Sequence, residues 1–120
     1  MIALIVDDSK VVRTATSRIL AELGIGYDTA DDGKMALEKV QNTKFDFVLL
    51  DWNMPKMDGL EFFKAAKKVQ NFIDTKVIFC TTESEVEKIS KALNEGVNEY
   101  IMKPFDKEII EDKLRFLGLI

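Results

Sequence analysis

Short runs of apolar residues alternate along the chain with longer segments in which apolar residues recur every three or four positions. Four clear runs and one weaker run are found: Ile2–Val6, Tyr27–Ala30 (the weaker), Phe45–Leu50, Val77–Cys80 and Tyr100–Met102. Runs of this length, apolar at successive positions, are typical of strands buried on both faces of a parallel sheet. The pattern therefore predicts five buried strands.

The segments between the strands have the periodicity of amphipathic helices. Their apolar positions are Val12, Ala15, Ile19 and Leu23; Met35, Ala36 and Val40; Leu60, Phe63 and Ala66; Val86, Ile89 and Leu93; and Ile110, Leu114 and Leu117. Residue types that favour helix ends stand at the expected places. Ser9, Asp32 and Asp106 are predicted N-caps, and Gly24 and Gly96 are predicted helix ends.

Strands that alternate with helices predict an α/β fold with a parallel sheet covered on both sides. We expect a (βα)₅ doubly wound, three-layer sandwich. The 120 residues have the length of one domain, spanning 1–120. A content of 47% hydrophobic and 32% charged residues is typical of a soluble globular protein.

Composition excludes several classes of function. The 17 basic and 21 acidic residues give a net charge of −4, which argues against direct nucleic-acid binding. The absence of histidine excludes His-dependent catalysis and His-ligated zinc. The longest apolar run, Met1–Val6, is too short for a membrane span and lacks the basic leader of a signal peptide. One cysteine, Cys80, fits a reducing compartment, and we expect a cytoplasmic protein.

Polar residues follow four of the predicted strands directly. They are Asp7 and Asp8, Asp51, Thr81 and Thr82, and Lys103 with Pro104. Ligands of doubly wound sheets bind outside the carboxyl ends of the strands. Three carboxylates, a hydroxyl and an amine are therefore expected at one edge of the sheet.

Each of these groups has a physical role in phosphoryl transfer. Clustered carboxylates raise one another's pKa unless a hard cation joins them, and Mg²⁺ prefers oxygen ligands of this kind. One aspartate, held ionised, would be the nucleophile that forms an aspartyl phosphate. Mg²⁺ and Lys103 would neutralise charge on the transferring group, and a threonine hydroxyl would donate to a phosphoryl oxygen.

Three motifs carry a resemblance that covers essentially the whole chain. They are LIVDDS (Leu4–Ser9), LDWNMPKMDG (Leu50–Gly59) and YIMKPF (Tyr100–Phe105). Together the chain resembles the receiver domain of bacterial two-component response regulators, of the single-domain chemotaxis (CheY) type. Trp52, Asn53 and Glu83 resemble that subgroup, whereas Thr82 stands where a smaller residue is often found. The resemblance implies the flavodoxin-like strand order 2-1-3-4-5.

The resemblance also implies a role for each matching residue. Asp51 matches the phosphoacceptor, Asp7 and Asp8 match the acidic pair that binds Mg²⁺, and the backbone carbonyl of Asn53 matches a further metal ligand. Thr81 matches the switch hydroxyl, Tyr100 the aromatic switch and Lys103 the phosphoryl-binding lysine. The Lys103–Pro104 bond is expected to be cis. Self-catalysed phosphotransfer and autodephosphorylation are expected, rather than an enzyme acting on a separate substrate.

For a receiver of this type, a sensor histidine kinase is the expected phosphodonor, and a phosphatase is a further candidate partner. The output is expected to be a changed protein surface formed by helix 4, strand 5 and helix 5. The residues expected on that surface are Ser84, Ile89, Tyr100, Met102 and Lys113. For the chemotaxis type, the partner would be the flagellar motor switch protein, and another protein output is the alternative.

Two other interpretations stay open from the residues. In the first interpretation, the chain is a phosphorelay shuttle or the receiver of a longer transcriptional regulator. The second is an aspartyl-phosphate hydrolase of the haloacid dehalogenase kind, which needs a general acid two positions after the nucleophile. That position is Asn53, which cannot act as an acid. A flavin site is disfavoured because Asp7 and Asp8 would repel its phosphate.

Overall fold

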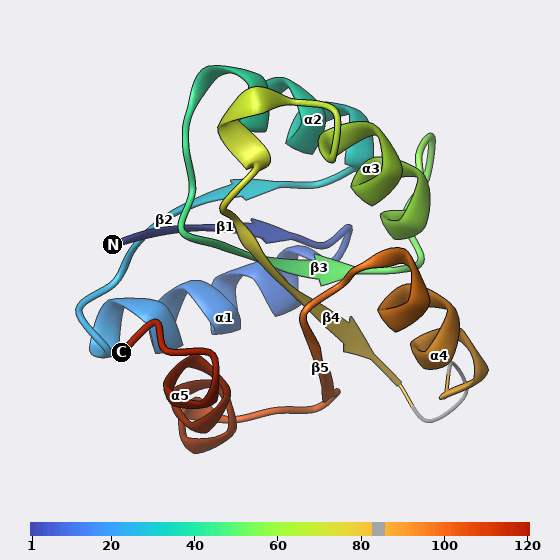
Figure 1. The fold of residues 1–120 in the computed structure, drawn as a ribbon. Coiled ribbons are helices and arrows are strands. Elements are labelled where there is room, and N and C mark those ends of the chain that lie inside the picture. Colours follow the sequence, from blue (N-terminus) through green and yellow to red (C-terminus); the bar gives the residue numbers. More distant parts are fainter. Residues whose placement is uncertain (83–85) are drawn as a thin grey trace.

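The computed structural model describes residues 1–82 and 86–120, and these form a three-layer α/β sandwich (Figure 1). The strands are β1 (Ile2–Val6), β2 (Gly26–Ala30), β3 (Phe47–Asp51), β4 (Lys76–Thr81) and β5 (Glu99–Met102). The helices are α1 (Lys10–Glu22), α2 (Gly33–Asn42), α3 (Gly59–Ala66), α4 (Val86–Glu95) and α5 (Lys107–Phe116), with a short 3₁₀ turn, η1 (Gln70–Phe72).

The sheet is parallel, with strand order β2-β1-β3-β4-β5, which confirms the doubly wound prediction. β1 and β3 lie at its centre, and their registers place Val6 beside Leu50. Asp51 lies beside Cys80 in the next pair of strands. Because all strands run the same way, the residues after β1, β3, β4 and β5 come to one edge.

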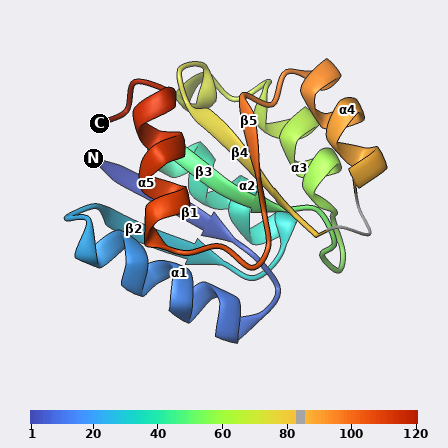
Figure 2. The ribbon, with the colours of Figure 1, turned by 90° about the horizontal axis from the view of Figure 1, so that it is seen from below.

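Two apolar cores lie on the two faces of the sheet. One contains buried residues of α2, α3 and α4, such as Val40, Phe62 and Ala92. The other contains buried residues of α1 and α5, such as Leu20 and Leu114. Figure 2 shows the corresponding layers, with α1 and α5 on one side of the strands. β1, β3 and β4 are almost completely buried between these layers, which explains their unbroken apolar sequences. The prediction of five buried strands is wrong for β2, an edge strand whose first three residues are exposed.

Side chains at the predicted helix starts satisfy free backbone N–H groups. Ser9, Asp32 and Asp106 accept hydrogen bonds from the N–H groups of Val12, Met35 and Ile109 respectively, which confirms the three predicted N-caps. Gly24 and Gly96 have positive φ angles of 75° and 112° just after α1 and α4, as predicted for helix ends.

The third strand starts later than its apolar run suggests. β3 begins at Phe47, whereas the prediction began at Phe45. Phe45 is buried as part of the core although it precedes the strand. Asp46 lies between them, and its carboxylate accepts a hydrogen bond from the Ile2 N–H at 2.8 Å. An apolar residue buried in a loop therefore cannot be distinguished in the sequence from one buried in a strand.

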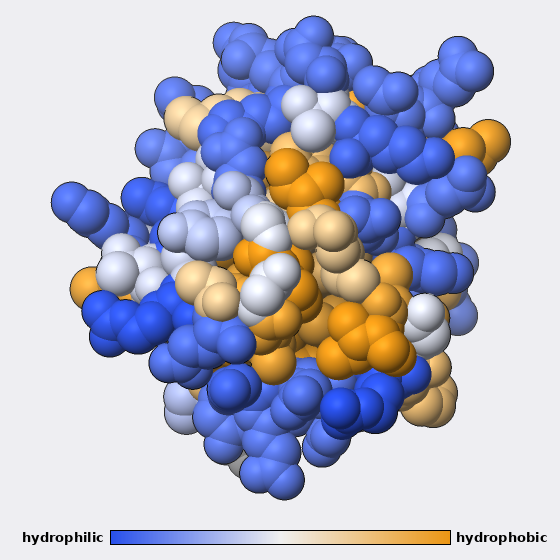
Figure 3. Space-filling model, turned by 90° about the vertical axis from the view of Figure 1, so that its left-hand side faces the viewer, coloured by the Kyte–Doolittle hydropathy of each residue, from blue (hydrophilic) through white to orange (hydrophobic). Residues whose placement is uncertain are grey.

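The two ends of the strands differ in character. Both termini lie at the amino-terminal side of the sheet, on the left of Figure 1, and Figure 3 shows apolar side chains gathered on that face. The terminal residues Met1 and Ile120, at the ends marked N and C in Figure 1, are both exposed. The charged residues of the predicted site lie at the opposite, carboxyl end. In the described part of the chain, no helix is long and apolar enough to cross a membrane.

Candidate phosphoryl-transfer site

Three carboxylates meet at the carboxyl ends of β1 and β3. Asp7 and Asp8 follow β1, Asp51 ends β3, and one carboxylate oxygen from each lies within 4.8 Å of the others. Asp7 and Asp51 are only 3% and 6% exposed, whereas Asp8 is exposed. The structure therefore brings together the three aspartates that the sequence placed at one edge.

Lys103 crosses from the end of β5 to this cluster. Its Nζ lies 2.8 Å from Asp7 Oδ2 and 3.1 Å from Asp51 Oδ1. Its backbone N–H also donates to the Thr81 carbonyl, at 2.6 Å. The Lys103–Pro104 peptide bond is cis, as the resemblance implied. One ammonium thus bridges two buried carboxylates from different strands.

The charges at the site are not balanced by this one lysine. Burial, and after it the charge of Asp7, raise the pKa of Asp51 to about 6, although Lys103 acts in the opposite direction. The pKa of Lys103 is raised: burial alone would lower it, but the hydrogen bond to Asp7 and the charges of Asp51 and Asp7 outweigh that effect. Such a set of oxygen donors fits a hard divalent cation.

The local backbone holds the acidic pair in place. Asp7 Oδ1 accepts a hydrogen bond from the Ser9 N–H at 2.9 Å, and the Asp7 carbonyl accepts one from Arg13 Nη1 at 2.7 Å. Arg13 lies on α1, so the guanidinium ties the helix to the end of β1. Arg13 was not predicted from the sequence, because no motif marks which arginine of a helix folds back on its own N-terminal loop.

The loop after Asp51 is closed tightly against β3. The Gly59 N–H donates to the Trp52 carbonyl at 2.8 Å, and a Cβ at Gly59 would lie 2.4 Å from the Asp51 carbonyl oxygen. Only glycine fits this approach. Asp58 and Glu61 form a capping box at the start of α3. This cap was not predicted, although an Asp-x-x-Glu spacing before an apolar segment is its sequence signal.

Trp52 and Asn53, directly after Asp51, differ in burial. Trp52 is 8% exposed and its ring meets the edge of Phe79, with ring centroids 5.1 Å apart. Asn53 is exposed, and its side-chain Oδ1 accepts a hydrogen bond from Lys88 of α4 at 3.1 Å. The indole is therefore held in the apolar core directly after Asp51 in the chain, where it can report on changes at the acceptor.

The two predicted switch residues lie on neighbouring strands. Thr81, at the end of β4, is fully buried, and its hydroxyl donates to the Thr82 carbonyl at 3.2 Å. Tyr100, on β5, is half-buried, and Lys113 Nζ lies 5.3 Å from the centre of its ring. In this state the Thr81 hydroxyl is thus engaged with backbone.

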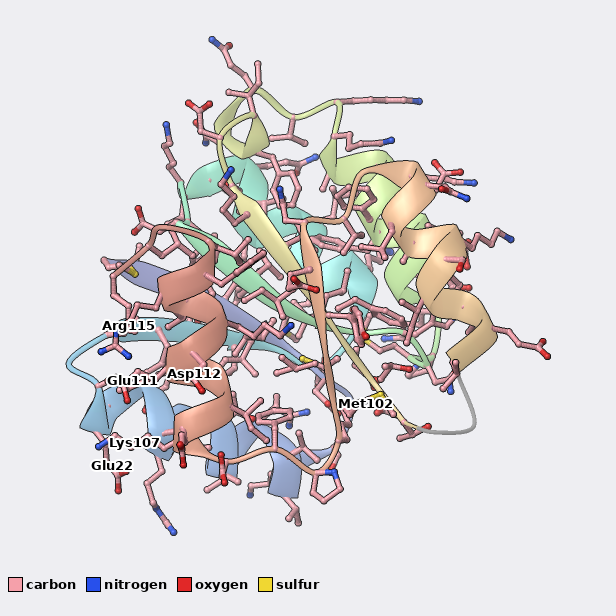
Figure 4. All side chains as sticks on the ribbon, turned by 60° about the horizontal axis from the view of Figure 1, so that its bottom comes forward. Glu22, Met102, Lys107, Glu111, Asp112 and Arg115 are labelled. Carbon is pink, nitrogen blue, oxygen red and sulfur yellow. The ribbon has the colours of Figure 1, made fainter. Side chains whose placement is uncertain are left out.

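The predicted partner surface is distributed over three elements. Ile89 lies on α4, Tyr100 and Met102 on the edge strand β5, and Lys113 on α5, where it also lies 3.5 Å from Glu99. Figure 4 shows that charged side chains of α5 lie away from Met102, on the side of Glu22 of α1. They are Lys107, Glu111, Asp112 and Arg115. Ser84 and Glu83 lie outside the described residues.

Two other groups singled out in the sequence do not join the site chemistry. Cys80 is 4% exposed within β4, and burial raises the pKa of its thiol to about 12. Asp32 caps α2, and its Oδ2 lies 3.4 Å from Lys56 Nζ in the loop after β3. Asp32 thus caps a helix, as its sequence predicted.

Comparison with known proteins agrees with this geometry. The model of the response regulator receiver domain family matches residues 3–115. The chemotaxis proteins CheY of Pseudomonas aeruginosa and CheY-3 of Vibrio cholerae are 35% and 38% identical to the chain over 112 residues. These alignments cover 92% of this chain and 90% and 86% of the relatives.

Solved structures give the same result. Vibrio cholerae chemotaxis protein CheY4 superimposes with a TM-score of 0.89 at 36% identity, over 96% of both chains. The receiver domain of a Pseudomonas aeruginosa sensor histidine kinase, solved with a magnesium ion in its active site cleft, shares the fold with a TM-score of 0.88. It is 24% identical, over 98% of this chain and 97% of its own.

Proposed function

Because the chain belongs to the response regulator receiver domain family, we propose that it accepts a phosphoryl group on Asp51 from a sensor histidine kinase. The observation that carries the proposal is the bridge of Lys103 between Asp7 and Asp51, within a cluster of three carboxylates. A phosphoacceptor must be ionised yet shielded from other reactions, and Asp51 is both nearly buried and held by an ammonium. The alternatives in the same family, a relay shuttle and a longer regulator, would use the same site.

In the transfer step a carboxylate oxygen of Asp51 attacks the phosphorus of a phosphohistidine. A P–O bond forms, the P–N bond breaks, and the electron pair leaves with the imidazole nitrogen. Lys103 is placed to hold a phosphoryl oxygen, since its Nζ already lies 3.1 Å from Asp51 Oδ1. Hydrolysis of the acyl phosphate, which we expect this domain to catalyse on itself, restores the carboxylate.

Asp8, Asp51 and the Asn53 backbone carbonyl are the proposed ligands of Mg²⁺, with Asp7 bound through water. A bound Mg²⁺ would neutralise charge on the phosphoryl group during transfer. The three carboxylate oxygens within 4.8 Å fit such an ion. Asp7 and Asp8 also exclude a bare phosphate from the site by repulsion until the cation is present.

Phosphorylation is proposed to change the α4–β5–α5 surface rather than to start a reaction on a substrate. The Thr81 hydroxyl, now engaged with the Thr82 carbonyl, would donate to the phosphoryl group, and Tyr100 would follow into the vacated space. The flagellar motor switch protein is the proposed partner, supported by the similarity to chemotaxis proteins. A cytoplasmic location and a cognate phosphatase stay predictions.

Metal binding is tested by the emission of Trp52. Titration of the protein with Mg²⁺ should give a saturable change, because the indole follows Asp51 directly and is 8% exposed. Asp8→Asn should weaken the apparent affinity at least tenfold, since it removes one of the charged ligands. Asp31→Asn, an exposed aspartate after β2, is the matched control and should behave as wild type. An unchanged titration in Asp8→Asn would place the ion elsewhere.

The switch is tested by partner binding in the presence of beryllofluoride, which stands in for the phosphoryl group on Asp51. Thr81→Ala loses a charge-assisted hydrogen bond of roughly 1.5–3 kcal/mol in the active state only. Its gain in affinity for the motor switch protein of the same organism should therefore be smaller than that of wild type by a factor of about ten or more. Calorimetry with and without beryllofluoride measures this gain.

Tyr100→Ala should show the same loss, while both variants still bind beryllofluoride at Asp51. Tyr27→Ala, an exposed tyrosine on the far edge strand β2, is the control. A full response to beryllofluoride in both Thr81→Ala and Tyr100→Ala would refute the switch, even with Asp51 as the acceptor.

A further inference from the structure

Lys88 connects α4 to the loop that follows the acceptor. Its Nζ donates to Asn53 Oδ1 at 3.1 Å and lies 5.3 Å from the centre of the Trp52 ring. Trp52 and Asn53 are the two residues directly after Asp51. An ammonium from the first turn of α4 therefore lies beside the segment that carries both the acceptor and a proposed metal ligand.

Apart from the ion pairs of Glu95 at its C-terminal end, the other contacts of α4 among the described residues are mainly apolar and shallow. Ala92 is its buried residue, Ile89 is half-buried, and Val86 and Leu93 are 50% and 41% exposed. A helix held by so little buried surface is easily shifted. A polar contact at its N-terminal half then has a large share in fixing its position relative to β3.

We propose that Lys88 is a positioning residue through which α4 senses the net charge of the acidic site; the proposal rests on the proposed phosphoacceptor function. Asp7, Asp8, Asp51 and Lys103 together leave the metal-free site with a net charge of −2. That charge attracts the Lys88 ammonium toward Trp52 and Asn53. A phosphoryl group adds about one further negative charge to Asp51 at neutral pH.

The attraction changes with each step of the cycle. Mg²⁺ alone brings the site to about zero charge, which removes the long-range pull on Lys88, and a phosphoryl group then brings it back to about −1. Coupling is reciprocal, so Lys88 must oppose Mg²⁺ binding to the unmodified site and favour the phosphoryl group once Mg²⁺ is bound. Lys88 thus favours the doubly loaded site over the site with metal only.

These opposite effects on the binding of Mg²⁺ and of the phosphoryl group distinguish charge sensing from simple mechanical support. Lys88→Met keeps the length of the side chain and removes the charge. It should raise the affinity for Mg²⁺ about two- to fivefold and lower the affinity for beryllofluoride, at saturating Mg²⁺, by a similar factor. These sizes correspond to a partly exposed charge interaction. If Lys88 only held the loop in shape, its removal would lower the affinity for both Mg²⁺ and beryllofluoride.

The experiment measures both affinities by calorimetry and by the midpoint of the Trp52 emission change, at low ionic strength. Lys91→Met, an exposed lysine one turn further along α4, is the matched control and should change each affinity much less. Lys88→Arg keeps the charge and should restore both values toward wild type. Raising the salt concentration should reduce the Lys88→Met effects.

Two results would overturn the proposal. One is that Lys88→Met lowers the affinity for both Mg²⁺ and beryllofluoride. The other is that its two affinities are indistinguishable from those of Lys91→Met. The Mg²⁺ measurement decides the role of Lys88 even if beryllofluoride does not bind to the wild-type protein. Failure of wild type to bind beryllofluoride would count against Asp51 as the acceptor, and so against the proposed function.

Discussion

Asp51→Asn is expected to abolish phosphoryl uptake completely. Incubation of the wild-type protein with Mg²⁺ and acetyl phosphate should raise its intact mass by one phosphoryl group. The variant should show no increase, because an amide oxygen is a poor nucleophile and carries no charge for the cation to hold. Asp51 is 6% exposed, so the substitution of a nearly isosteric side chain leaves the surroundings in place. Intact-protein mass spectrometry makes the measurement.

The chemistry of the linkage identifies the acceptor independently. Hydroxylamine cleaves acyl phosphates but leaves phosphoserine and phosphothreonine intact, so it should remove the wild-type label. Asp31→Asn should be labelled as wild type is, because Asp31 is exposed and stands outside the cluster of Asp7, Asp8 and Asp51. A label that resists hydroxylamine and maps to Thr81 or Thr82 would refute the proposed mechanism.

The same substitution is expected to stabilise the fold in the absence of metal. The pKa of Asp51 is about 6 in the folded protein, raised from 3.8, first by burial and then by the charge of Asp7. The folded state therefore holds the Asp51 proton more tightly than the unfolded chain does, and stability falls as pH rises from about 4 to about 6. At pH 7 the ionised carboxylate costs up to about 3 kcal/mol of stability, which corresponds to a rise of about two pKa units.

Asp51→Asn removes that cost, so at pH 7 its free energy of unfolding should exceed that of wild type by up to about 3 kcal/mol. For a domain of this size, the melting temperature would rise by roughly 10 °C. At pH 4, where the folded wild type carries a protonated Asp51, the two proteins should unfold alike. Urea titrations in EDTA at pH 4 and pH 7 provide the comparison.

Mg²⁺ should reduce the difference in free energy of unfolding between Asp51→Asn and wild type, because it binds the folded wild type and stabilises it by mass action. Asp31→Asn is again the control, with wild-type stability at both pH values. Equal stability of wild type and Asp51→Asn at pH 7 would mean that Lys103 fully compensates the acidic cluster. The cost of ionised Asp51 would in that case be absent.

The part of the structure that was predictable is the part fixed by local sequence. Strands buried on both faces are apolar throughout, and a parallel arrangement places their following residues at one edge. The sequence alone was therefore enough to group Asp7, Asp51 and Lys103. Helix caps such as Asp106 depend on neighbours three residues away, and they were predictable for the same reason.

Contacts between distant segments were not predictable in this way. Lys88 meets Asn53 across 35 residues, and nothing in the sequence distinguishes it from other lysines of α4. Arg13 reaches the Asp7 carbonyl only because α1 packs at one angle on the sheet. Phe45 was assigned to a strand because burial in a loop and burial in a strand leave the same apolar residue. Tertiary position, not residue type, decides all three.

The state of Cys80 has a practical consequence for labelling the protein. Its thiol is 4% exposed, and burial raises its pKa to about 12, so at pH 7.5 roughly one molecule in ten thousand or fewer carries the reactive thiolate. Maleimide and spin-label reagents should therefore pass over it. A cysteine introduced on an exposed position of α4 or α5 would be modified alone, with the native residue kept. Distance measurements by electron resonance or single-molecule fluorescence could then follow the motion of either helix in an otherwise unaltered chain.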